Sequence, residues 1–175
     1  MTTRVGFLRA VNVGRRTVGM ARLAEICEDL GYTDVWTYIN SGNVVFSTGG
    51  SRASIEHAME VAFEAAFGFE VTTFVRTAAE LRAVLAVEPF EVAAGDTYFV
   101  TLLKDPPPAS AATALAHASN DFDTLVVHGR EVHWRMRGKS TDTTITRATW
   151  NLLGHHASTS RNVNMLRKLQ AKLDS

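Results

Sequence analysis

The sequence lacks several features that would assign it to a specialised class of protein. Its single cysteine, Cys27, cannot form a disulfide within the chain. The first apolar run is interrupted by Arg9 and is too short for a signal peptide or a membrane span, which predicts a cytoplasmic protein that does not enter the membrane. Eighteen basic residues balance eighteen acidic ones, and the formal net charge of zero removes the overall attraction that a non-specific nucleic-acid binder needs.

What the 175 residues do have is the composition of an ordinary globular protein, with 46% apolar, 21% charged and 9% aromatic side chains. A chain of this length can bury about 70% of the surface of its unfolded form, so it needs no metal or disulfide to hold a core. We therefore expect one or two small domains and no cofactor. Composition selects no reaction, so whether the protein is an enzyme stays open, and it identifies no catalytic residue.

Hydrophobic periodicity divides the first half of the chain into strands and helices. Short runs rich in Val and Phe predict strands, and apolar residues spaced by three and four predict helices. Gly31 stands where the first of these helices would end. The predicted elements are a strand over 4–11, a helix over 20–30, strands over 35–40 and 43–47, a helix over 51–67, a strand over 69–76 and a helix over 77–86.

The second half of the chain repeats this order. Near the end of each half the letters also match, since Arg76, Leu81 and Arg82 align with a second Arg, Leu and Arg further on. These equivalents are Arg161, Leu166 and Arg167. The predicted elements are a strand over 97–104, a helix over 109–119, strands over 124–128 and 131–136, a helix over 144–153, a strand over 157–160 and a helix over 163–173.

The shared order predicts an α+β fold built by internal duplication. Strand-helix-strand-strand-helix-strand is the order of a ferredoxin-like unit, in which helices cover one face of an antiparallel sheet. We expect two such βαββαβ modules, each followed by an extra helix, with the first module over residues 1–90 and the second over residues 91–175.

Several stretches of the sequence resemble a known bacterial family. They are LRAVNVG, TYINSGNVVF and the RNVN near the end of the chain. In these stretches the chain is similar to the family called domain of unknown function 1697, and the similarity runs over the whole sequence. The resemblance implies a two-module α+β fold and supports the duplication, but it implies no activity.

The start of the last predicted helix differs from its counterpart in the first half. There, Thr77 and Glu80 have the spacing of a capping box, which places a carboxylate at the positive end of the helix. The last helix has no acid in its first turn, so its free N–H groups and nearby donors could bind a phosphate or carboxylate. The alternative is that Asn162 caps the helix and Lys168 is a solvated charge. The candidate anion ligands here are Arg161, Asn162, Asn164 and Lys168.

The first loop provides weaker candidates. Asn12 lies in a loop that carries Arg15 and Arg16 directly after a predicted strand, but the glycine spacing fits neither a dinucleotide fingerprint nor a Walker sequence. A flexible connection with exposed arginines is the alternative. Arg9 stands within an apolar strand, where a charge must be paired or must reach a polar cleft. A structural ion pair and a ligand contact satisfy that need equally well.

The first predicted hairpin would place aromatic and amide side chains on one face. With a turn at Ser41 and Gly42, Asn40 faces Asn43, Tyr38 faces Val45 and Trp36 faces Ser47. This face could stack a base or a flat ligand, or it could dock against the other module. The residues expected on the opposite, helix-covered face are Val35, Ile39, Val44 and Phe46.

The second predicted hairpin gathers His128, Glu131 and His133 on one face. Two imidazoles and a carboxylate suggest a metal, but no third His or Cys stands at a recognised ligand spacing. A solvated polar face explains the three residues better, so no metal site is predicted.

We expect a binding protein for a small anionic or nucleotide-like ligand, with its pocket between the two modules. One alternative is single-stranded RNA binding on the face of Trp36 and Tyr38, helped by Arg135, Arg137 and Lys139, which the zero net charge disfavours. The other is a non-catalytic interaction module, and the oligomeric state stays open. The candidate ligand-binding residues are Arg9, Asn12, Asn43, Arg161, Asn162, Asn164 and Lys168.

Overall fold

The computed structural model describes residues 1–9, 17–39, 42–155 and 157–175. The chain divides into two compact units, Met1–Leu81 and Arg82–Ser175. The sequence-based boundary after residue 90 stays a prediction. None of the helices in the described part of the chain combines the length and hydropathy that a membrane span requires.

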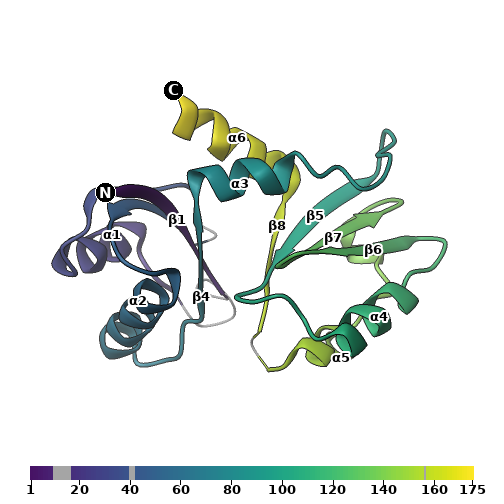
Figure 1. The fold of residues 1–175 in the computed structure, drawn as a ribbon, viewed down its shortest axis with the longest axis horizontal. Helices are drawn as coiled ribbons and strands as arrows, with labels where there is room; N and C mark the ends of the chain where they lie inside the picture. The colour runs from purple at the N-terminus through teal and green to yellow at the C-terminus, as the bar shows by residue number, and fades with distance from the viewer. Residues whose placement is uncertain (10–16, 40–41, 156) are drawn as a thin grey trace. The chain divides into compact units, whose positions relative to one another are not determined.

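The first unit contains a four-stranded antiparallel sheet in the order β2-β3-β1-β4. Two helices connect the strands, and α3 (Ala78–Leu85) follows the last strand (Figure 1). The other elements are β1 (Thr2–Leu8), α1 (Met20–Asp29), β2 (Thr33–Thr37), β3 (Asn43–Thr48), α2 (Arg52–Phe67) and β4 (Thr73–Thr77).

The second unit follows the same path, with a sheet in the order β6-β7-β5-β8. Its second crossover is less regular than the sequence predicts, because short 3-10 turns flank a single turn of α-helix. The elements are β5 (Thr97–Leu102), α4 (Ala109–His117), β6 (Asp123–His128), β7 (Glu131–Met136), α5 (Arg147–Trp150), β8 (Thr159–Asn162) and α6 (Val163–Asp174), with 3-10 turns at Ser140–Asp142 and Asn151–Leu153. Two ferredoxin-like α+β modules are therefore present, as predicted.

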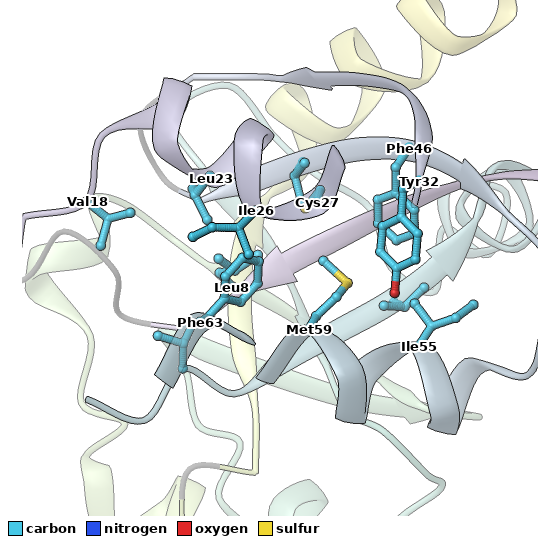
Figure 2. Packing of buried hydrophobic residues seen from close by; sticks show 13 residues of the cluster. Leu8, Val18, Leu23, Ile26, Cys27, Tyr32, Phe46, Ile55, Met59 and Phe63 are labelled. Carbon is cyan, nitrogen blue, oxygen red and sulfur yellow. The ribbon is translucent and has the colours of Figure 1, made fainter. Parts of the chain in front are cut away.

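The core of the first unit lies between its sheet and its two helices (Figure 2). Leu23 of α1 and Met59 and Phe63 of α2 are fully buried against the strands. The ring of Tyr32 stacks on Phe46 with centroids 4.7 Å apart. Helical spacing places these apolar side chains on one side of each helix, so burying them fixes both helices on the same face of the sheet.

Helix α2 is also attached to the sheet by a buried carboxylate. Glu56 is 2% exposed, and its Oε2 accepts a hydrogen bond from the main-chain N–H of Val75 at 2.9 Å. Arg52, one turn earlier, donates to the other oxygen at 2.5 Å. Because β4 is an edge strand, Glu56 satisfies an N–H group that no neighbouring strand bonds.

The pairing of the first hairpin differs from the predicted one. Trp36 lies opposite Val45 rather than Ser47, and the N–H of Tyr38 donates to the carbonyl of Asn43 at 3.0 Å. The predicted pairs are therefore wrong by two residues. The cause is the length of the connection, since β2 ends at residue 37 and β3 begins at residue 43, and a two-residue turn is too short to join them. The predicted pair of Asn40 and Asn43 lies partly outside the described residues.

The two faces of this hairpin are mostly as predicted. Val44 and Phe46 are buried in the helix-covered core, and Val35 packs against it. Ile39 was expected beside them, but it is 52% exposed and has a φ of +48°, so the chain has already left the strand there. Trp36 lies on the other face and is partly buried.

In the second unit, Asp123 attaches the irregular crossover to the sheet. Its fully buried carboxylate accepts hydrogen bonds from Trp134 Nε1 at 2.8 Å and Thr143 Oγ1 at 2.6 Å. The N–H and hydroxyl of Thr144 add two more at 3.0 Å. Burial alone would raise the pKa of this carboxyl, but the four hydrogen bonds together lower it.

Candidate functional site

Two of the residues predicted to bind an anion, Asn162 and Asn164, form the N-terminal cap of α6. Asn162 is the N-cap residue, and its Oδ1 accepts a hydrogen bond from the N–H of Asn164 at 2.8 Å. Helix α3 instead has the predicted capping box, with Thr77 and Glu80 bonded reciprocally at 2.8 and 3.0 Å. No acidic residue lies in the first turn of α6, as the sequence indicates.

Arg161 does not lie at this helix end but within β8. It is 7% exposed, and its Nη1 donates to the hydroxyl of Thr159 at 2.7 Å and to the carbonyl of Ser160 at 3.0 Å. Burial lowers the pKa of the guanidinium to about 10, so it stays charged at neutral pH. Lys168, further along α6, is exposed. The residues grouped by the sequence motif therefore occupy different environments.

The other predicted residues belong to the first unit. β1 ends at Leu8, so Arg9 follows the strand rather than standing inside it, and its N–H donates to the carbonyl of Thr72 at 2.9 Å. Asn12 lies outside the described residues. Asn43 is fully buried at the start of β3, and its Nδ2 donates to the carbonyl of Tyr38 at 2.9 Å, which fixes the end of the hairpin.

The polar face predicted for the second hairpin exists, but it is not solvated. His128 lies opposite Glu131 and Val126 opposite His133, which places the three polar side chains on one face. His133 is fully buried and Glu131 is 8% exposed, so the expectation of a solvated face is wrong for both. Within the described part of the chain, no three His, Cys, Asp or Glu side chains are grouped to hold a metal.

His133 forms a hydrogen-bonded pair with Tyr98 of β5. The hydroxyl of Tyr98 lies 2.5 Å from Nδ1 of His133, and Nε2 of the same ring is buried without a hydrogen-bond partner among the described residues. Burial, with a smaller contribution from His128, lowers the pKa of His133 to about 4, so the ring is neutral at pH 7. Burial raises the pKa of Tyr98 to about 12, so the phenol also keeps its proton.

Tyr98 forms one wall of a pocket of about 710 Å³ that lies within the second unit. Residues 88–92 form a second wall, and Arg167 of α6 completes the lining. The ring of Phe90 meets Tyr98 edge to face, with centroids 4.8 Å apart. The guanidinium of Arg135 lies over the same phenylalanine at 5.3 Å. These two contacts hold the segment 88–92 against the sheet.

The charged residues that line this pocket are Glu88, Glu91 and one cation, Arg167. Its guanidinium lies 3.6 Å from a carboxylate oxygen of Glu88, and the two side chains are 47% and 68% exposed. Glu88 has a φ of +41°, a left-handed conformation that is uncommon for residues other than glycine. The pocket therefore combines aromatic walls with one accessible cation that is loosely paired.

The model of the family described as "Protein of unknown function (DUF1697)" matches residues 1–133. The chain belongs to the DUF1697 family. A conserved bacterial protein from Streptococcus pneumoniae, SP0830, has a similar structure with a TM-score of 0.75 and 22% sequence identity, and the match covers 100% of this chain and 99% of that one. This similarity shows the fold alone. None of the curated proteins matches the chain.

The basic side chains proposed for RNA binding are largely engaged within this DUF1697 protein. Arg135 donates to the carbonyl of Glu91 at 2.8 Å and to the hydroxyl of Thr124 at 2.9 Å. Arg137 pairs with Asp96 at 3.1 Å. Both guanidinium groups therefore offer less free charge to a phosphate backbone than the sequence suggests.

The pocket of this DUF1697 protein is not among the sites that its sequence predicts. Phe90 carried one available signal, because an aromatic side chain in a segment rich in Pro, Glu and small residues needs a surface to cover. The alignment of Arg167 with Arg82 was a second signal, because it marks an arginine that both halves of the sequence share. In the structure Arg82 pairs closely with Asp174 at 2.6 Å, whereas Arg167 faces the pocket.

Proposed function

We propose that this protein binds a small organic anion with a flat ring, a class that includes nucleotide-like compounds, in the pocket of the second unit. The observation that carries the proposal is that Arg167 stands beside the Phe90–Tyr98 aromatic pair in one pocket. A pocket with apolar walls and a few convergent polar groups is the usual form of a small-molecule site.

The walls of the pocket support a ring as part of the ligand. Phe90 and Val92 present apolar surface beside the buried ring of Tyr98, and Val92 is 48% exposed despite its apolar side chain. A flat ring placed here would cover that surface and make aromatic contacts, which contribute about 0.5–1.5 kcal/mol beyond burial of area. The walls therefore favour a planar, partly apolar ligand over a fully solvated ion.

The guanidinium of Arg167, which lines the pocket together with Glu88 and Glu91, supports an anion as the polar part of the ligand. Arg167 is half-exposed, and a guanidinium binds carboxylate or phosphate through two parallel N–H donors. Arg135 is already bonded to Glu91 and Thr124, so Arg167 is the lining cation that a ligand can reach. The volume of about 710 Å³ lies in the range of pockets that hold small molecules.

Thermal unfolding with matched probes tests the proposal. Phenyl phosphate carries both the ring and the anion, whereas phenol and inorganic phosphate each carry one part. A ligand at about a hundred times its dissociation constant stabilises a protein by roughly 2.7 kcal/mol and raises the midpoint by several degrees. We expect phenyl phosphate and adenosine monophosphate to stabilise the protein more than phenol or phosphate do.

Substitution of two adjacent basic residues of α6, Arg167 and Lys168, tests where the anion binds. Arg167→Ala should remove the shift caused by phenyl phosphate, whereas Lys168→Ala should keep it, because only Arg167 lines the pocket. A shift that is lost in Lys168→Ala but kept in Arg167→Ala would place the anion near Lys168, outside the pocket. That result would overturn the proposed pocket. Equal shifts in the two variants, or no shift with any probe, would overturn anion binding there.

A further inference from the structure

We infer that the carboxylate of Glu88 occupies the place of the ligand's anionic group on Arg167 and is displaced when the ligand binds. The inference rests on the proposed function and deepens it, since it assigns a specificity-determining role to Glu88. It also names the chemistry of the ligand's polar end, which is a carboxylate or a phosphate monoester.

The geometry of the Glu88–Arg167 pair is that of a contact that can be exchanged. The closest nitrogen and oxygen atoms are 3.6 Å apart, which is longer than a hydrogen bond, and the side chains of Arg167 and Glu88 are 47% and 68% exposed. By comparison, Arg82, the equivalent of Arg167 in the first half of the sequence, approaches Asp174 to 2.6 Å. Exposed pairs contribute little to stability, so a ligand that replaces this one loses little.

The backbone around Glu88 explains why its carboxylate stays near Arg167 nonetheless. Glu88 has a φ of +41° and precedes Pro89, which restricts the conformations open to the residue before it. Phe90 follows and is held by Tyr98 and by Arg135. The segment is therefore fixed on its C-terminal side, and only the side chain of Glu88 has to move to release Arg167.

A ligand anion can bond Arg167 better than Glu88 does. A carboxylate or phosphate that enters with its ring against Phe90 is free to approach the guanidinium in the plane of the fork, at about 2.7–2.9 Å. Glu88 reaches the same group at 3.6 Å from a fixed backbone. Once displaced, its exposed carboxylate returns to solvent, so no buried charge is left without a partner.

The test is a titration of each variant with phenyl phosphate, followed by the amide resonances of the intact protein in two-dimensional NMR. Glu88→Gln keeps the size of the side chain and removes its charge. We expect the dissociation constant to fall at least fivefold, because the competitor for Arg167 is gone. Asp121→Asn makes the same change in net charge on an exposed residue of the same unit, outside the pocket, and should change the constant less than twofold.

Two further measurements distinguish displacement of Glu88 from Arg167 from simple repulsion between the charge of Glu88 and the anion. In the background of Arg167→Ala, the Glu88→Gln substitution should no longer tighten binding. Phenol, which has no anion, should bind wild type and Glu88→Gln equally. Tightening that persists without Arg167, or that also occurs with phenol, would overturn the displacement of Glu88.

The outcomes distinguish this inference from the proposed function. If phenyl phosphate binds, Arg167→Ala weakens it and Glu88→Gln leaves it unchanged, the pocket stands and the role of Glu88 is wrong. If wild type fails to bind and Glu88→Gln binds, Glu88 blocks Arg167 without being displaced, and the inference is wrong. If neither binds phenyl phosphate at millimolar concentration, the proposed function itself is wrong.

Discussion

Arg76 and Arg161 occupy the same position in the two sheets of the protein. Arg76 lies opposite Val5 of the central strand β1, and Arg161 lies opposite Val100 of the central strand β5. The Nη1 of each donates to the carbonyl of the residue before it, at 3.1 and 3.0 Å. Both side chains are buried, so the duplication preserves a buried guanidinium at an edge strand of each module.

Removing the second of these arginines should destabilise the protein. Arg161→Ala removes the donor of hydrogen bonds to Thr159 and Ser160, and each such bond to a charged group contributes about 1.5–3 kcal/mol. We expect the free energy of unfolding, measured in urea, to fall by about 2–4 kcal/mol. Arg147→Ala, at an exposed position of α5, is the control and should change it by less than about 0.5 kcal/mol. A fall that is equally small for Arg161→Ala would show that its guanidinium has no structural role.

The buried carboxylate of Glu56 gives a prediction for the first unit. Glu56→Ala leaves the N–H of Val75 without its acceptor and Arg52 without its carboxylate. We expect the free energy of unfolding to fall by about 2–3 kcal/mol. Hydrogen exchange of the Val75 amide should accelerate more than that of its neighbours in β4.

The control for this substitution is Glu64→Ala, an exposed residue of the same helix. It should change neither the free energy of unfolding nor the exchange of Val75 appreciably. Unchanged protection of the Val75 amide in Glu56→Ala would mean that the carboxylate does not protect the edge of the sheet.

The sequence predicted the fold well because each element carries its own local pattern. The spacing of Leu23, Ile26 and Cys27 identifies α1 without knowledge of its partners, and the order of elements then identifies the ferredoxin-like modules. Thr77 and Glu80 identify the start of α3 in the same way. Helical spacing and capping boxes can be recognised because each involves only residues close together in the sequence.

What the sequence could not predict depends on loop conformations and side-chain contacts that hydrophobic periodicity does not mark. The register of the first hairpin depends on a connection that leaves the strand before Ile39, a conformation that the letters do not specify. The pocket depends on Phe90 meeting Tyr98 and on Arg167 of the last helix facing Glu88. Glu88 and Arg167 are far apart in the chain and meet only in the folded protein, and no local pattern marks either contact.

Asp123 should make the stability of the protein depend on pH in acid. Because its pKa is lowered in the folded state, its contribution is present above the pKa of the unfolded chain, about 4, and is lost as the pH falls through the folded value. Asp123→Asn should lower the free energy of unfolding at pH 7 by about 2–3 kcal/mol, since an amide cannot accept all four hydrogen bonds.

Urea unfolding between pH 7 and pH 3 checks this prediction. The difference between wild type and Asp123→Asn should shrink below pH 4. Asp121→Asn, two residues earlier and exposed, should behave as wild type at every pH. A difference that stays constant down to pH 3 would contradict the assigned role of the carboxylate.

His133 should produce a second pH dependence at milder acidity, because the duplication has placed an imidazole where the first unit has a valine. Val45 lies opposite Val5 of the central strand, and His133 lies opposite Val100. Burial holds the pKa of His133 at about 4 in the folded state, whereas an unfolded histidine titrates near 6.5. Between these values the unfolded chain binds the extra proton, so the free energy of unfolding must fall as the pH falls from about 6.5 to 4.

The variant His133→Val restores the residue of the first unit and removes this titration. We expect the loss of unfolding free energy between pH 7 and pH 4.5 to be smaller in the variant, by on the order of 2 kcal/mol. His117→Gln, at an exposed position of α4, should leave the loss unchanged. An identical fall in wild type and His133→Val would show that the ring takes up its proton in the folded protein at the same pH as in the unfolded chain. The Tyr98–His133 pair would then have to accommodate the charged imidazole, whose Nδ1–H would donate a hydrogen bond to the oxygen of Tyr98.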